Sequence, residues 1–160
     1  MFLDTDLDFA FLQNLEVKNA VWGGLMTAGA IARSAKGVII SGRCRDLAEH
    51  RAQNFPVFAR GHSTLGQSPF TRPSEINVAL TINPLSNMEP SVSDDGFPAV
   101  MIQPGDWMIG DEDGVVCVPR ELEDKVLELA AKGRDIDDLC MIDTRAGKGV
   151  QASFKLHRGK

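Results

Sequence analysis

The sequence predicts a mixed α/β layered domain, and three patterns along its 160 residues carry that prediction. A helix-forming, alanine-rich stretch leads directly into the apolar run Gly37–Ile40. The pair Asp113-Gly114 lies between two further apolar runs, which is typical of a β-hairpin turn. After Pro119, apolar residues recur at helical spacing. Strands and helices that follow one another in this way are typical of layered α/β domains.

The first of these patterns runs from Trp22 to Asp46 and reads WGGLMTAGAIARSAKGVIISGRCRD. We interpret it as a turn, a helix, a buried strand and a loop that carries paired opposite charges. The alanines favour a closely packed helix, although Gly29 weakens that helix by about 1 kcal/mol. The β-branched run bounded by glycine favours the strand.

Both ends of this stretch offer groups suited to an anionic ligand. The double glycine lets the backbone N–H groups of Gly24, Leu25 and Met26 approach a small anion, and a helix N-terminus adds partial positive charge. At the other end, Arg45 offers a planar fork for a carboxylate and Asp46 a hard oxygen ligand for a divalent cation. Taken separately, the two pieces also fit a tight turn and a surface ion pair.

The next stretch is expected to form a short helix, two strands and two loops. Residues 46–53 predict a helix, and Phe55–Ala59 a core strand whose pairing Pro56 limits on one side. A polar loop follows, in which Arg60 and His62 are candidates to face a site, although a loop histidine without a visible partner is more often solvated. Alternation over Ile76–Ile82 predicts a half-buried strand, and residues 83–98 a loop insertion.

Strands and a helix are expected to complete the chain as a single domain, 1–160. We predict strands at Ala99–Ile102 and Trp107–Gly110, and a hairpin turn at the acidic cluster Asp111–Gly114, which lacks the spacing of a calcium loop. Pro119 starts a helix that we expect to end at Gly133, before a second short amphipathic helix. Residues 144–160 are expected to be an extended tail, and residues 1–21 form an N-terminal segment that we cannot assign.

Composition narrows the possible partners. The formal net charge of −5, without a basic patch, argues against a nucleic-acid partner. The three cysteines, at positions 44, 117 and 140, show neither metal-ligand spacing nor an even disulfide set, which favours a reducing, cytoplasmic setting. No stretch approaches the roughly 18 apolar residues that a membrane span needs. The acidic N-terminus does not resemble a signal peptide.

The motifs together resemble the family named for regulator of ribonuclease E activity A, which includes the 4-hydroxy-4-methyl-2-oxoglutarate aldolases. The resemblance covers residues 22–133, including FPVFARG and QPGDWMIGDEDGVVCVP, and its most specific feature is Gly24 followed, after twenty intervening residues, by Arg45-Asp46 and then Glu49. It implies a swivelling β/β/α fold, assembled as a homotrimer or a dimer of trimers. Family members carry a longer segment before the Trp22 turn, so this chain is expected either to be N-terminally truncated or to manage without those elements.

The resemblance also implies a divalent-metal-dependent lyase acting on 2-oxo acids, a class II pyruvate aldolase. Such an enzyme cleaves 4-hydroxy-4-methyl-2-oxoglutarate to pyruvate, decarboxylates oxaloacetate, or does both through a pyruvate enolate. Asp46 would hold Mg²⁺ or Mn²⁺, Arg45 would stabilise the enolate, and Arg45 with the N–H groups of Gly24, Leu25 and Met26 would bind the substrate carboxylate. Some aldolases carry an acidic residue in place of Gly24, and we expect Glu49 to substitute for it as a catalytic residue. The alternative is a non-catalytic, protein-binding regulator resembling the ribonuclease inhibitor, or an inactive fragment.

Overall fold

The computed structural model of the protein describes residues 9–13, 17–68, 70–83 and 98–159. The chain divides into two compact units, Met1–Cys117 and Val118–Lys160. Each of these two units is described by itself below. Among the described residues, no helix is both long enough and apolar enough to cross a membrane.

The first unit is built on a parallel sheet with β3 (Gly37–Cys44) at its centre. Three strands pair with β3 in parallel: β1 (Phe9–Gln13), β2 (Ala20–Trp22) and β4 (Val57–His62). Residues 9–22 had no assignment from sequence, and two of these strands lie there. The layered α/β architecture that the sequence predicts is confirmed.

The central strand β3 is longer than the apolar run that predicts it. It continues beyond Ile40 through Ser41 and Gly42, which were expected to end it, to Cys44. All of its residues except Arg43 are buried, as is typical of a parallel strand covered on both faces. A register shift in its pairing with β4 lies between Ile40 and Arg43, close to the loop that follows the strand.

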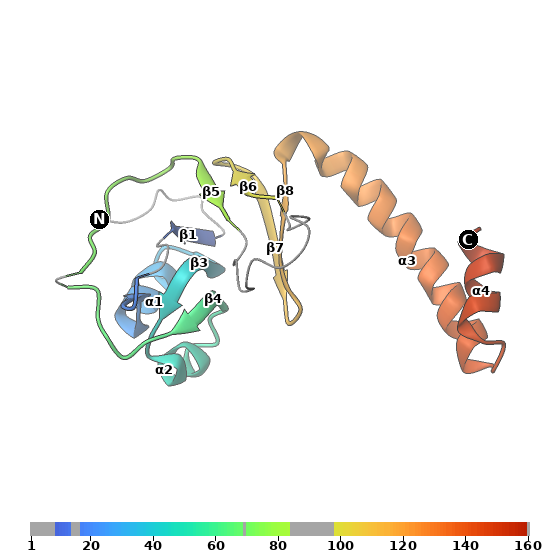
Figure 1. Cartoon of the computed structure of the whole chain (residues 1–160), viewed down its shortest axis with the longest axis horizontal. Helices are drawn as coiled ribbons and strands as arrows, with labels where there is room; N and C mark the ends of the chain where they lie inside the picture. The colour runs from blue at the N-terminus through green and yellow to red at the C-terminus, as the bar shows by residue number, and fades with distance from the viewer. Residues whose placement is uncertain (1–8, 14–16, 69, 84–97, 160) are drawn as a thin grey trace, which may run out of the picture. The chain divides into compact units, whose positions relative to one another are not determined.

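Two helices pack beside this sheet. The expected charged loop, Arg45-Asp46, joins β3 to the second of them. Figure 1 shows α1 (Gly24–Ile31) and α2 (Leu47–Ala52) next to β3. Apolar side chains of α1, of β3 and of the short segments beside them form the core: Trp22, Ala30, Ala35, Val38, Ile40, Cys44 and Phe55. This core fixes the two places where chemistry is expected, the start of α1 and the start of α2.

The remaining strands of this unit form two antiparallel pairs. β5 (Leu80–Ile82) pairs with β6 (Val100–Ile102), and β7 (Trp107–Asp111) with β8 (Gly114–Val118). The predicted hairpin turn is confirmed, and the backbone N–H of Asp113 donates to Asp111 Oδ1 at 2.9 Å within it. The strand predicted over Ile76–Ile82 is shorter than expected. Most of the predicted insertion at 83–98, namely residues 84–97, lies outside the described residues.

The second unit is a pair of helices, and here two expectations were wrong. After the short 3₁₀ helix η1 (Arg120–Leu122), α3 (Glu123–Arg145) runs straight through Gly133, because a glycine in a helix interior costs only about 1 kcal/mol. The tail expected to be extended from residue 144 instead forms α4 (Val150–His157). Gly147 and Gly149, both at φ 82°, let the chain turn back between the two helices.

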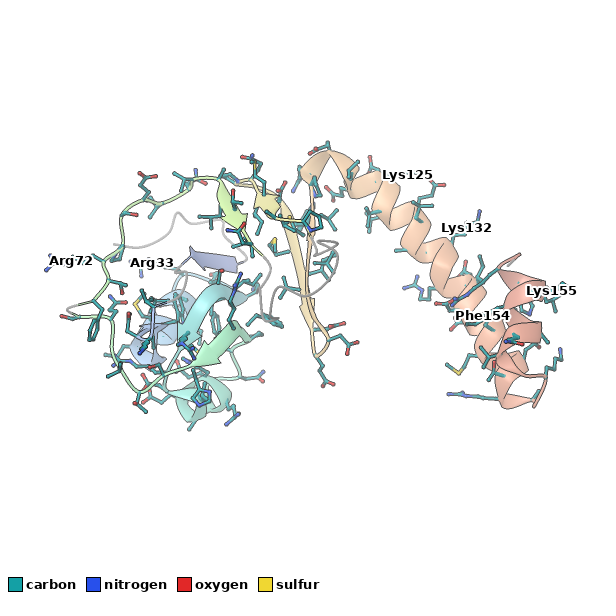
Figure 2. All side chains as sticks on the ribbon, in the orientation of Figure 1. Arg33, Arg72, Lys125, Lys132, Phe154 and Lys155 are labelled. Carbon is teal, nitrogen blue, oxygen red and sulfur yellow. The ribbon has the colours of Figure 1, made fainter. Side chains whose placement is uncertain are left out.

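Polar contacts hold these two helices together. Lys148 Nζ donates to Asp143 Oδ1 at 2.7 Å, and His157 Nε2 lies 3.0 Å from Asp143 Oδ2. These two neighbours hold the pKa of the Asp143 carboxyl below its usual value. The Ser153 hydroxyl donates to the Cys140 carbonyl at 3.4 Å. Figure 2 labels Lys125 and Lys132 along α3, and the Lys125 ammonium donates to Glu128 Oε2 of the same helix at 2.8 Å.

Candidate active site

The candidate site lies where β3 ends and α2 begins. Asp46 caps α2 with a left-handed backbone, φ 61° and ψ 42°, a conformation that aspartate tolerates better than most residues. This residue turns the chain from the strand into the helix. Its Oδ2 atom accepts a hydrogen bond of 3.0 Å from the backbone N–H of Gly24, the first residue of α1. One carboxylate thus joins the starts of both helices.

Arg45 extends beside this carboxylate. Its Nε atom lies 3.6 Å from Asp46 Oδ2, and the two side chains are 47% and 36% exposed. The backbone N–H of Arg45 donates to the Trp22 carbonyl at 2.9 Å, which ties the residue to β2. A Cβ atom added at Gly23 would lie 2.6 Å from Asp46 Oδ2 and 2.9 Å from Arg45 Nε. Glycine is therefore required at position 23 for both charged groups to approach the backbone this closely.

The Glu49 carboxylate lies over the neighbouring glycine. A Cβ atom added at Gly24 would overlap Glu49 Oε2, so this carboxylate fills the space that a side chain at position 24 would enter. The Asp46 and Glu49 carboxylates thus both lie against Gly24, the first through its hydrogen bond from the Gly24 N–H and the second over the Gly24 Cα. The geometry therefore suits the expected substitution of Glu49 for an acidic residue at position 24.

The backbone N–H donors at the start of α1 differ in part from expectation. The Gly24 N–H, expected to bind a substrate carboxylate, donates to Asp46, and the Met26 N–H donates to the Gly23 carbonyl at 3.0 Å. The Leu25 side chain beside them is 89% exposed. The structure thus gives Gly24 the role of holding the Asp46 carboxylate, and it pairs the Met26 N–H within the helix turn.

A buried hydrogen-bond chain beneath the site has no clear signal in the sequence. Trp22 Nε1 donates to Thr27 Oγ1 at 2.8 Å, and Thr27 Oγ1 lies 3.0 Å from His50 Nδ1. All three side chains are buried, and His50 directly follows Glu49 in α2. Within the part of the chain that the structure describes, His50 Nε2 has no hydrogen-bond partner. A threonine and a histidine on apolar helix faces are the only hints that the sequence offers.

Other polar candidates lie elsewhere. The Arg60 guanidinium donates to the Asn83 carbonyl. Together with Ser41, Asp111 and Glu112, Arg60 lines a separate cleft of about 410 Å³ whose walls are otherwise mostly apolar. His62 belongs to β4, and its carbonyl accepts a hydrogen bond of 3.3 Å from Arg43. Neither residue is among those around Gly23 and Gly24.

The oxygen atoms around Gly24 are of the type that Mg²⁺ and Mn²⁺ prefer. Asp46 and Glu49 supply carboxylates at a partly exposed place, and Mg²⁺ commonly uses one or two carboxylates and keeps several waters. In the described ranges, no three His, Cys, Asp or Glu side chains gather as a metal site, so a closed site made only of protein ligands is not present there. Cys44 is buried, and burial raises the pKa of its thiol, which leaves it a poor ligand or nucleophile.

Comparison with known proteins gives relatives in this same stretch of the chain. A protein of Halalkalibacterium halodurans named "Putative 4-hydroxy-4-methyl-2-oxoglutarate aldolase" is 33% identical over 119 residues, which cover 74% of this chain and 49% of the relative. An uncharacterised protein of Methanocaldococcus jannaschii is 33% identical over 113 residues, which cover 71% and 47%. The chain therefore spans about half the length of the curated relatives it matches.

Solved structures support the same fold. The crystal structure of an uncharacterised protein from Pseudomonas syringae pv. tomato superposes with a TM-score of 0.76 at 27% identity, covering 91% of this chain and 66% of that one. RraAS2 of Streptomyces coelicolor, described as an unusual member of the RNase ES inhibitor RraA family, superposes at 0.67 with 18% identity, covering 81% and 59%. This second likeness concerns the fold alone.

The family assignment rests on a family model that matches more than half of the chain. This family model, described as "RraA-like: Aldolase/RraA", matches residues 7–117. The match includes residues before the Trp22 turn and ends before the Pro119 helix, so its limits differ from the range of the resemblance, 22–133. It contains Gly24, Arg45, Asp46 and Glu49, and it coincides with nearly all of the first structural unit. The chain belongs to the RraA-like, Aldolase/RraA family.

Proposed function

We propose that the chain is a divalent-metal-dependent lyase that acts on 2-oxo acids. The observation that carries this proposal is the convergence of Arg45, Asp46 and Glu49 on the glycine pair Gly23-Gly24. A non-catalytic surface does not require a half-exposed arginine and two carboxylates to meet at one backbone turn, whereas a catalytic site does. The same arrangement suits a small substrate that carries a carboxylate next to a ketone.

Asp46 is the residue that would hold the cation, directly or through water, with the Glu49 carboxylate beside it. When bound, a divalent cation supplies Lewis-acid polarisation of the substrate ketone. The Gly24 N–H donates to Asp46 Oδ2 and so fixes the direction of this carboxylate. This arrangement leaves the rest of a coordination sphere to water and substrate, as Mg²⁺ prefers.

Arg45 is placed to bind the carboxylate of the substrate. Its guanidinium can donate two parallel hydrogen bonds to the two carboxylate oxygens, which fixes the substrate in one plane. As the bond between C3 and C4 breaks, its electron pair moves towards the ketone and forms the enolate of pyruvate. Arg45 stabilises the negative charge that develops there, as an oriented cation in a partly shielded site does.

Glu49 is placed to move a proton. In aldol cleavage of 4-hydroxy-4-methyl-2-oxoglutarate, a base takes the proton of the C4 hydroxyl, and the leaving fragment is a second pyruvate. In decarboxylation of oxaloacetate, the leaving fragment is carbon dioxide and no hydroxyl proton is removed. Both reactions end when C3 of the enolate takes up a proton, so a single site serves both.

The test is release of pyruvate from oxaloacetate and from 4-hydroxy-4-methyl-2-oxoglutarate by the purified chain, with Mg²⁺ and then with excess chelator. Free Mg²⁺ decarboxylates oxaloacetate slowly, so Arg45→Ala serves as the blank. Arg43→Ala is a matched control, because this arginine is two residues away and bonds to the His62 carbonyl instead. Chelator-sensitive release above the blank, retained in Arg43→Ala, is expected. Release no faster than the blank from a folded sample would favour a protein-binding role.

A further inference from the structure

The Arg45 guanidinium lies in a slot between two glycines from distant parts of the chain. A Cβ atom added at Gly23 would lie 2.9 Å from Arg45 Nε, and one added at Gly66 would lie 2.9 Å from Arg45 Nη1. Both distances are shorter than an ordinary van der Waals contact. The missing side chains of Gly23 and Gly66 therefore define the room in which the guanidinium sits.

The segment that carries Gly66 is held in place by its own hydrogen bonds. The backbone N–H of Ser63 donates to the Cys44 carbonyl at 2.9 Å, and that of Ala20 donates to the Leu65 carbonyl at 2.8 Å. The Leu65 N–H donates to the Ser63 hydroxyl at 3.2 Å. These bonds tie residues 63–65 to β3 and to β2. The position of Gly66 beside Arg45 is thus fixed, because its segment is hydrogen-bonded to the end of β3, the strand that Arg45 directly follows.

Little else in the described structure fixes the plane of this guanidinium. Its ion pair with Asp46 is 3.6 Å long and reaches only Nε. A long arginine side chain that is 47% exposed would otherwise sample many rotamers. Bidentate binding of a carboxylate depends on the plane of the fork, and a misplacement of about 1 Å at a reacting group costs about 100-fold in rate.

We propose that Gly66 is a positioning residue that sets the plane of the Arg45 guanidinium for binding the substrate carboxylate. This inference rests on the proposed function, because it deepens the role assigned to Arg45. Gly66 touches neither substrate nor cation. It acts by keeping the space beside Nη1 free of a side chain, as Gly23 does beside Nε.

The decisive variant is Gly66→Ala. Gly66 is not among the residues with positive φ, so alanine can adopt its backbone conformation. The atom that the new methyl group meets is the far end of a flexible side chain, so the fold is kept and the guanidinium moves. Gly61→Ala is the matched control: its Cβ would lie 3.1 Å from Nη1 of Arg43, an arginine outside the site.

Two measurements distinguish the position of the Arg45 guanidinium from its effect on the reaction. The first is kcat/KM for pyruvate release, which should fall about 10- to 100-fold in Gly66→Ala and stay near the wild-type value in Gly61→Ala, with both melting temperatures unchanged. The second is the NMR resonance of the Arg45 Nε–H group, assigned with Arg45→Lys. It should shift in Gly66→Ala and not in Gly61→Ala, whether or not the protein turns over substrate.

The outcomes are distinct. If the Arg45 resonance does not shift in Gly66→Ala, Gly66 does not confine the guanidinium and the proposal is refuted. If the resonance shifts but kcat/KM is unchanged, the position of the guanidinium does not matter for the reaction, which also refutes it. An equal loss of kcat/KM in Gly61→Ala also overturns it, because the effect would then not act through Arg45. If the wild-type protein has no turnover but the Arg45 resonance still shifts in Gly66→Ala, the proposed function is refuted, whereas the contact between Gly66 and the guanidinium is supported.

Discussion

The buried chain from Trp22 through Thr27 to His50 makes a quantitative prediction about stability. Thr27→Val keeps the shape of the side chain and removes the hydroxyl that serves both neighbours. Trp22 and His50 are 2% and 4% exposed, so water cannot readily replace the lost partner. Two polar atoms, the indole N–H and His50 Nδ1, would lose their hydrogen bonds inside the core.

The magnitude follows from the two stranded groups. A buried donor or acceptor that loses its partner costs about 1–3 kcal/mol, so the two groups together should lower the free energy of unfolding of Thr27→Val by roughly 2–6 kcal/mol. Thr27→Ser is the matched control. It keeps the hydroxyl and loses one buried methyl group, which costs about 1 kcal/mol. The valine variant should therefore be the less stable of the two, although valine is the more hydrophobic.

Urea unfolding followed by Trp22 fluorescence measures this difference. The second tryptophan, Trp107, is partly exposed and is replaced by phenylalanine in every sample, so that the signal reports the core beneath the site. Reporting on Trp22 also separates the first unit from the helix pair that follows it. A serine variant as unstable as the valine variant, or more so, would show that packing and not hydrogen bonding controls Thr27.

Three further predictions concern charge and cysteine chemistry. Asp46→Asn keeps a residue that tolerates the left-handed backbone, so the melting temperature should hold while the Mg²⁺ dissociation constant rises about tenfold or more; unchanged affinity in a metal titration would remove Asp46 from the metal site. Cys44→Ser should keep its turnover, because the Cys44 thiol is buried and its pKa is raised, and a loss of turnover would mean that this sulfur takes part in the reaction. Lys148 and His157 lower the pKa of Asp143, so the stability that this carboxylate gives to α3 and α4 is complete above about pH 4, the value of an unfolded carboxyl, and is lost as the pH falls through its lower folded pKa. Circular dichroism should therefore show a steeper acid loss of helix in the wild type than in Asp143→Asn, and equal pH profiles would contradict this role.

The elements that sequence predicts well are those with a local cause. The alanine-rich helix, the apolar run of β3 and the Asp113-Gly114 turn each carry their signal within a few residues. The misplaced ends have non-local causes. β3 continues beyond Ile40 because β1 pairs with Ser41, and because β2 and β4 pair with Arg43 and Cys44. Gly133 stays helical because nothing in its surroundings interrupts the hydrogen bonds of α3.

In the candidate site, too, residues close in sequence could be predicted, and contacts between distant residues could not. Arg45, Asp46 and Glu49 stand close together in sequence, so their spacing alone places them on one loop and one helix turn. Gly66 is far from Arg45 in sequence, and only pairing of β4 with β3 brings its segment beside the arginine. The same holds for Thr27 and His50, which lie on two helices that the core brings together. Contacts of this kind depend on tertiary structure and have no local pattern.

The parallel pairing around β3 also governs how the protein assembles as it leaves the ribosome. β1 and β2 are made before β3, and in the described part of the chain each pairs with that later strand. Parallel partners must be brought together across long connections, and such non-local pairing slows folding. β1 and β2 therefore cannot form these pairings until residues 37–44 have been synthesised, and Arg45 and Asp46 follow directly after that strand.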